Sequence, residues 1–67
     1  MNNNIEISKE TVTIEFYNAK QVAEMLVCSR ATAYRTIDQL NQELEKKGFY
    51  TFSGKVSKKY FHERMYI

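Results

Sequence analysis

The chain contains few of the residue types that build disulfide-linked, metal-binding or membrane proteins. Its 67 residues include one cysteine, two glycines, and no proline or tryptophan. The single Cys28 excludes an intramolecular disulfide and a zinc site with four cysteine ligands. No apolar run approaches the roughly 20 residues of a spanning helix. Because no signal peptide is recognisable, we expect a cytoplasmic protein that engages no membrane.

Residues that carry catalytic or cofactor chemistry are equally scarce. His62 is the only histidine, and one histidine with one cysteine cannot complete a closed metal site. Two isolated glycines form no phosphate-binding loop, and no carboxylate pair stands beside a base. We therefore expect no enzyme activity, no metal and no cofactor.

The charge distribution is uneven. Residues 1–28 carry two Lys and four Glu, a balance of −2, whereas residues 29–67 carry eight Lys or Arg and four Asp or Glu, a balance of +4. A basic second part fits a module that presents one side to a polyanion. The alternative is a solvated surface of mixed charge.

The pattern along the chain predicts a flexible segment at residues 1–10 and a single domain at 11–67. Apolar residues alternate with polar ones from Thr11, which predicts a half-buried strand. One side of this strand would carry the apolar residues Val12, Ile14 and Phe16. The other side would carry Thr11, Thr13 and Glu15.

Two helices are expected next. Asn18 can cap a first helix that buries Val22, Leu26 and either Ala19 or Ala23. Ser29 is a good N-cap for a second helix of roughly 18 residues, which should end at the basic pair before Gly48. The buried stripe of this second helix would consist of Ala33, Ile37, Leu40 and Leu44.

The last part of the chain predicts a hairpin and a short helix. Segments 49–52 and 55–57 flank Ser53–Gly54, a candidate two-residue turn. Ser57 can cap a helix that turns Phe61 and Met65 inward. The order strand, helix, turn, helix, hairpin, helix describes an α+β winged helix-turn-helix fold.

The chain resembles the small winged-helix domains of the MerR/excisionase class, found in regulators and recombination accessory proteins of phages and mobile elements. The resemblance covers about residues 16–66. It rests on Phe16-Tyr17, on Gln21 to Leu26, on Ser29 to Ile37, and on Gly54 to Phe61.

This resemblance implies three local features. Val27 occupies a turn position where such domains usually have glycine, so a positive φ there would be costly. Thr36 stands where an apolar residue is common and leaves the packing to Ile37. Cys28 fills a position that similar domains give to a buried aliphatic side chain, which favours a small hydrophobic role.

The second helix is the expected reader of DNA, because the N-terminal half of a recognition helix meets base edges in the major groove. Arg35 is the preferred base contact, and Arg30 would contact a base or a phosphate. Alternatively, these arginines pair with Asp38 or Glu24. The predicted contacts of this helix are Ser29, Arg30, Thr32, Tyr34 and Arg35. For Ser29 capping is the competing role, and Tyr34 could instead pack on the hairpin.

Two other groups would contact the DNA backbone. Lys20 and Gln21 begin the first helix, where phosphate is favoured. The wing would contribute Ser53, Lys55, Lys58 and Lys59. The alternative for these lysines is a solubilising patch.

The sequence therefore predicts sequence-specific binding of double-stranded DNA by a small transcriptional regulator or an excisionase-like accessory factor. Because one module buries little surface, we expect a dimer, a tandem array, or a partner such as an integrase or another regulatory protein. The alternative is a protein-interaction adaptor or antirepressor with the same fold, anchored by Tyr50, Tyr60 and Tyr66.

Overall fold

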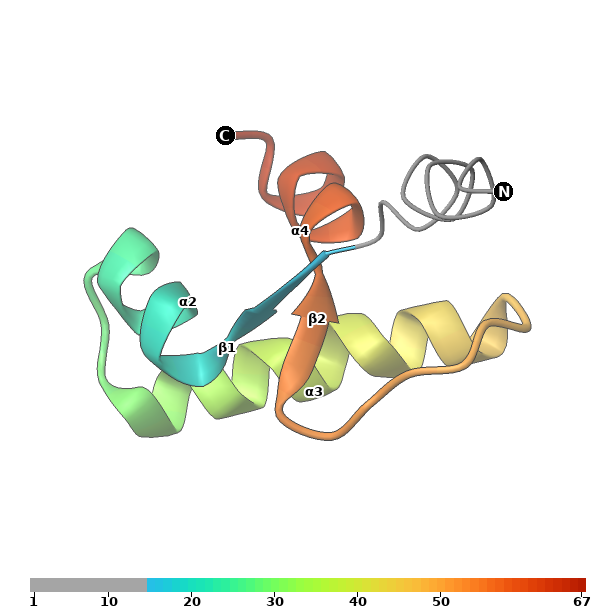
Figure 1. Cartoon of the computed structure of the whole chain (residues 1–67), viewed down its shortest axis with the longest axis horizontal. Helices are drawn as coiled ribbons and strands as arrows, with labels where there is room; N and C mark the ends of the chain where they lie inside the picture. The colour runs from blue at the N-terminus through green and yellow to red at the C-terminus, as the bar shows by residue number, and fades with distance from the viewer. Residues whose placement is uncertain (1–14) are drawn as a thin grey trace, which may run out of the picture.

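The structure, a computed structural model, describes residues 15–67. Its elements are β1 (Phe16–Asn18), α2 (Ala19–Leu26), α3 (Arg30–Lys46), β2 (Lys55–Ser57) and α4 (Lys58–Met65). In Figure 1, β2 crosses α3, α2 lies at the N-terminal end of α3, and α4 follows the far end of β2. The predicted flexible segment at 1–10 and the strand residues Thr11–Ile14 lie outside the described residues. Three helices and a two-stranded sheet form a small α+β fold consistent with a winged helix-turn-helix, as predicted.

The sheet pairs the start of the described chain with the strand that precedes the last helix. β1 and β2 are antiparallel, with Phe16 opposite Ser57, Tyr17 opposite Val56, and Asn18 opposite Lys55. The prediction that residues 49–52 form the partner strand of 55–57 was wrong. Only one bridge, Phe52 to Lys55, closes the expected turn at Ser53–Gly54.

A side chain of α3 also bonds to the carbonyls of this turn. The Lys55 N–H donates to the Phe52 carbonyl at 3.2 Å. The Lys55 carbonyl accepts a hydrogen bond from Asn41 Nδ2 at 2.9 Å, and the Phe52 carbonyl accepts one from the same group at 3.1 Å.

The N-cap of each helix is the residue that the sequence predicted. The Asn18 side chain accepts from the Gln21 N–H at 2.9 Å, and Gln21 Oε1 accepts from the Asn18 N–H at 2.9 Å, a complete capping box. Ser29 caps α3 through the Thr32 N–H, and Ser57 caps α4 through the Tyr60 N–H. These local bonds set where each helix begins.

The C-terminal end of α3 also follows the prediction. Gly48 adopts a φ of +95°, a conformation that glycine takes readily. The Gly48 N–H donates to the Glu45 carbonyl at 2.9 Å, and the Phe49 N–H donates to the Leu44 carbonyl at 3.0 Å. This pair of bonds is a Schellman motif, which ends the helix and reverses the chain toward β2.

The core lies where α2, α3, α4 and β2 meet. Its fully buried large side chains are Val22, Ile37, Val56 and Phe61. The predicted stripe of α3 is confirmed, since Ala33 and Leu40 are also buried and half-buried Leu44 packs against the core.

The predicted alternation of β1 was wrong at its last residues. Phe16 was expected on the buried side, but it is 38% exposed and packs edge-on against Phe52, with ring centroids 5.6 Å apart. Tyr17 faces the core instead and contacts the Phe61 ring. The pairing with β2 determines this, because Tyr17 lies opposite the buried Val56.

The terminal helix α4, which begins after its N-cap Ser57, buries one face against the core. Phe61 is buried and Met65 packs against the core, both as predicted. Tyr60 was expected to be exposed, but it is buried, and its hydroxyl donates to Glu43 at 2.7 Å. Among the helices within residues 15–67, none is long and apolar enough to cross a bilayer.

Candidate nucleic-acid interface

The turn between α2 and α3 is short and strained at one residue. It spans residues 27–29, and Val27 adopts a left-handed conformation with a φ of +52° and a ψ of +57°. The Cys28 N–H donates to the Ala23 carbonyl at 3.0 Å, and the half-buried Cys28 side chain packs against the core. Val27 therefore adopts the positive φ that the sequence marks as costly for a β-branched residue, and the packing of Cys28 agrees with its predicted hydrophobic role.

Three of the predicted contact residues form one hydrogen-bonded chain at the start of α3. Ser29 Oγ accepts from the Thr32 N–H and lies 3.1 Å from Thr32 Oγ1, to which it donates. Arg35 Nη2 donates to the same Thr32 hydroxyl at 3.2 Å. The chain orients the Arg35 side chain along the exposed face of the first two helical turns.

The two arginines of α3 are exposed and not neutralised. Within residues 15–67, ion pairs join Lys58 to Glu15 and Arg64 to Glu43, and neither Arg30 nor Arg35 belongs to one. The alternative pairing with Asp38 or Glu24 is therefore absent from the described part of the chain. Both guanidinium groups keep charge and donors for a ligand.

Tyr34 extends from α3 toward the turn at Ser53–Gly54. Its side chain is half exposed, and its Cε1 atom lies 3.7 Å from the position that a Cβ on Gly54 would occupy. The ring therefore packs at the tip of the turn, which was one of the two roles expected for it.

The predicted backbone contacts on α2 lie in its first turn. Lys20 and Gln21 are both exposed. The oxygen of the Gln21 side chain is occupied by the capping box, so its NH₂ group is the part that could donate to a phosphate.

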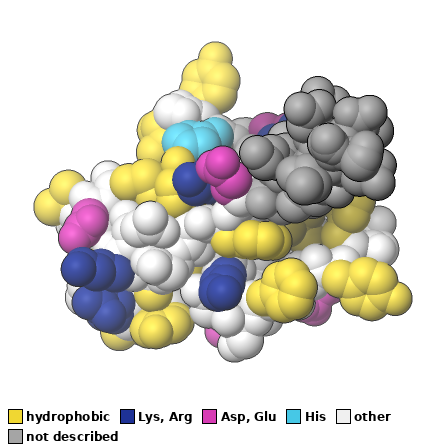
Figure 2. Space-filling model, viewed as in Figure 1, with side chains coloured by type: hydrophobic (Ala, Val, Ile, Leu, Met, Phe, Trp, Pro, Cys, Tyr) yellow, Lys and Arg dark blue, Asp and Glu magenta, His cyan; other side chains and the backbone are white. Residues whose placement is uncertain are grey.

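The predicted wing residues fall into two places. Ser53 and Lys55 lie on the turn and are exposed, whereas Lys58 and Lys59 belong to the first turn of α4. Figure 2 shows Lys and Arg side chains gathered over the α2–α3 end and hydrophobic ones along the α3–β2 connection. Only part of the predicted wing is therefore on the turn itself.

Lys58 has partners within the protein. Its Nζ lies 2.8 Å from Glu15 Oε1 and 5.0 Å from the Tyr17 ring centroid. The hydrogen bond to Glu15 raises the pKa of Lys58 and lowers the pKa of that carboxyl. The charge of Lys58 is thus largely balanced before any polyanion approaches.

Sequence reasoning missed Asn41. It is 6% exposed, the buried polar residue within the described chain, and its Nδ2 donates to the carbonyls of Phe52 at 3.1 Å and Lys55 at 2.9 Å. The signal was its position beside the apolar stripe, seven residues after Tyr34, on the side of the helix that faces the wing.

A short turn between two helices, an exposed basic start to the second helix and a turn fixed against that helix define a helix-turn-helix DNA-binding domain. The chain matches the Mga helix-turn-helix domain over residues 1–58, most of its length, and belongs to that family. No curated protein and no solved structure matches the chain. Domains of this class are typically non-catalytic. The sequence resemblance to MerR/excisionase domains therefore predicted the helix-turn-helix correctly, while the family that matches is the Mga family.

Proposed function

We propose that the protein binds double-stranded DNA sequence-specifically and acts in the cytoplasm as a transcriptional regulator. The observation that carries this proposal is the hydrogen-bonded chain from Ser29 through Thr32 to Arg35 on an exposed face of α3. Arg35, which no ion pair within residues 15–67 neutralises, is held by a short side chain rather than by a carboxylate. A guanidinium oriented in this way can donate two bonds to guanine in the major groove.

The remaining side chains of α3 have supporting roles. Arg30, one residue after the N-cap, contacts a neighbouring base or phosphate. Tyr34 lies beside the wing tip and reaches the DNA backbone at the edge of the groove. The hydroxyls of Ser29 and Thr32 orient Arg35 and can share a hydrogen bond with a phosphate.

Backbone contacts complete the interface from both sides. Lys20 and Gln21 lie at the N-terminus of α2, where N–H groups and the helix dipole favour phosphate. On the other side, Ser53 and Lys55 of the turn reach the backbone or minor groove, and Lys59 adds a charge from α4. Lys58 contributes least, because Glu15 already neutralises it.

One such module buries a small area on DNA, about 600–1,000 Å². We therefore propose that it occupies paired or tandem sites, or binds beside another regulatory protein. We favour regulation of transcription over an excisionase-like role with an integrase, because membership of the Mga family suggests regulation.

A protein-interaction role has one observation in its favour. The side chains of Tyr50 and Tyr66 are 97% and 93% exposed, so they do not pack into the core of this domain. An adaptor or antirepressor would use such side chains as anchors. The two functions predict opposite results with DNA.

The test is selection of duplexes from a random-sequence pool on the immobilised protein, followed by fluorescence anisotropy with the enriched duplex at low and moderate salt. We expect enrichment of one motif and tighter binding to it than to a scrambled duplex. Absence of binding at low salt by a protein whose circular dichroism shows a folded state would reject DNA binding and favour the protein partner.

A further inference from the structure

The wing turn, residues 52–55, is attached to α3 through the side chain of one residue. Asn41 Nδ2 donates to the Phe52 carbonyl at 3.1 Å and to the Lys55 carbonyl at 2.9 Å. These two carbonyls are the first and last of the turn. A single amide group therefore holds both ends of the turn against the recognition helix.

The chemistry of this contact suits an asparagine amide. Two carbonyl oxygens face the same point, and the NH₂ group carries an uncharged donor for each of them. The side chain is buried at 6% exposure, so water is a poor substitute for it. An apolar side chain of similar size would leave both carbonyls without this partner.

Tyr34 provides a second contact on the same side of the helix. It precedes Asn41 by seven residues, about two helical turns, so both side chains point toward the turn. The Tyr34 ring lies against Gly54, whose φ of +78° further restricts the turn. The wing turn thus packs against the side of α3 that carries Tyr34 and Asn41.

Lys55 links the contacts of Asn41 and Tyr34 with the turn to a positive charge that can meet DNA. Its own carbonyl accepts the bond from Asn41, and its backbone lies opposite Asn18 in the sheet. Its exposed ammonium group therefore projects from a backbone held on two sides. These contacts fix the backbone position from which the Lys55 side chain extends.

We propose that Asn41 is a positioning residue that sets where Lys55 meets the phosphate backbone relative to the bases read by α3. This inference rests on the proposed DNA binding. It means that Asn41, without touching DNA, determines whether the wing and the recognition helix bind in the same register.

The test is a double-mutant cycle between Asn41 and Lys55, measured with the duplex enriched by the selection. Binding is followed by anisotropy over a salt titration, at a temperature where circular dichroism shows every variant folded. Lys55→Ala in the wild-type background should lower the salt slope by about 0.9, the value of one phosphate contact. In the Asn41→Leu background, Lys55→Ala should cause no further change.

Leu44→Ala is the matched control, because it weakens the core from the same helix and an apolar side chain donates no hydrogen bond to the turn carbonyls. In that background Lys55→Ala should keep its full effect. Equal effects of Lys55→Ala in the wild-type and Asn41→Leu backgrounds would overturn the inference and leave DNA binding intact. Absence of binding by the wild type would overturn both.

If Asn41→Leu does not fold, Asn41→Ala replaces it in the same cycle. A wild-type measurement adds a second readout, since the Asn41 side-chain NH₂ protons should exchange slowly with solvent while donating to two carbonyls. Fast exchange of these protons would also overturn the inference.

Discussion

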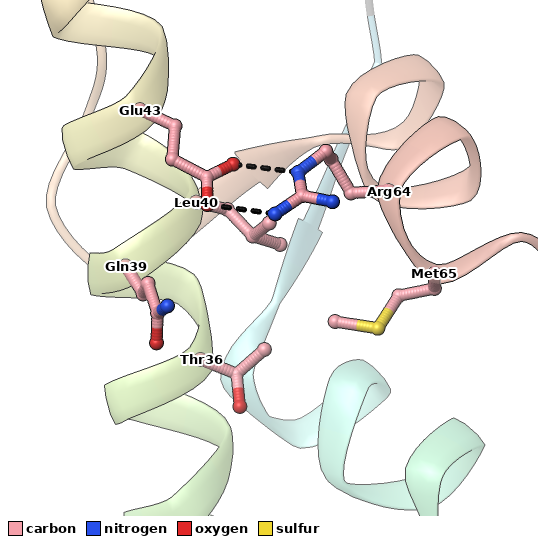
Figure 3. Close-up of a pocket in the computed structure, with 6 residues that line it drawn as sticks. All are labelled: Thr36, Gln39, Leu40, Glu43, Arg64 and Met65. Carbon is pink, nitrogen blue, oxygen red and sulfur yellow. Dashed lines mark hydrogen bonds and ion pairs between the residues drawn. The ribbon is translucent and has the colours of Figure 1, made fainter.

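Arg64 on α4 forms a bidentate ion pair with Glu43 on α3 through two hydrogen bonds. Arg64 Nε donates to Oε1 at 2.7 Å, and Nη2 donates to Oε2 at 2.9 Å. The Tyr60 hydroxyl donates to the same carboxylate at 2.7 Å. Figure 3 shows the pair at the edge of a groove between the two helices, with Met65 and Thr36 on its other side. Glu43 therefore receives three donors and ties α4 to the recognition helix.

The Glu43 contacts predict a specific loss of stability in acid. The hydrogen bond from Arg64, and then that from Tyr60, lowers the pKa of Glu43 from 4.5 to about 2. A carboxyl with a depressed pKa stabilises the fold fully above its unfolded value, and this contribution disappears as pH falls from about 4.5 to 2. Glu43→Gln should therefore lower the melting temperature at pH 7, and the difference from wild type should shrink to little near pH 2.

Thermal denaturation followed by circular dichroism across this pH range measures the effect. Glu63→Gln is the control, because Glu63 is exposed and forms no ion pair within residues 15–67. A wild-type-to-Glu43→Gln difference that stays constant with pH would contradict the role given to this carboxylate.

Val27→Gly should stabilise the protein. A β-branched residue in the left-handed region costs about 1–3 kcal/mol, whereas glycine adopts it freely at an entropic cost of about 0.5–1 kcal/mol. Val27 is 89% exposed, so little packing is lost. We expect a gain near 1 kcal/mol and a melting temperature higher by about 4–8 °C. Val27→Ala, which keeps a Cβ at positive φ, should gain clearly less, and equal gains would refute the strain.

Arg35→Ala should change which sequence is bound rather than only how tightly. Loss of a bidentate contact to guanine removes about 1–3 kcal/mol of discrimination at one base pair. Competition anisotropy against duplexes with each position of the selected site replaced would locate that base pair. Arg30→Ala is the comparison. A uniform loss across all duplexes for Arg35→Ala would reassign it to a phosphate.

Lys55 and Lys58 should differ in their effect on salt dependence. Lys55→Ala removes an exposed cation from the wing and should reduce the slope of log affinity against log salt by about 0.9. Lys58→Ala should reduce the slope less, because Glu15 already balances that charge at 2.8 Å. Equal slopes for the two variants would show that Lys58 leaves Glu15 for the DNA.

The features predictable from sequence are those set by bonds within a few residues. The N-cap residues Asn18, Ser29 and Ser57 each bond to an N–H three residues ahead, so local pattern suffices. The same holds for the end of α3 at Gly48.

The features that sequence reasoning missed depend on distant parts of the chain. β2 pairs with the distant β1 and makes only one bridge to residues 49–52, and three-residue strands carry too little pattern to predict this. Asn41 was missed for the same reason, since a polar residue beside an apolar stripe resembles an ordinary surface position.

The junctions between strands and helices have a consequence for engineering. β1 ends at Asn18 and α2 begins at Ala19, while β2 ends at Ser57 and α4 begins at Lys58. At both junctions the helix follows the strand with no residue between them. An inserted residue would therefore rotate the buried face of the helix away from the core. Within residues 15–67, the longest stretch between two elements is the one from α3 to β2. Extra residues in that stretch would lengthen the loop while Asn41 still holds the turn against α3, so the backbone of Lys55 should keep its place.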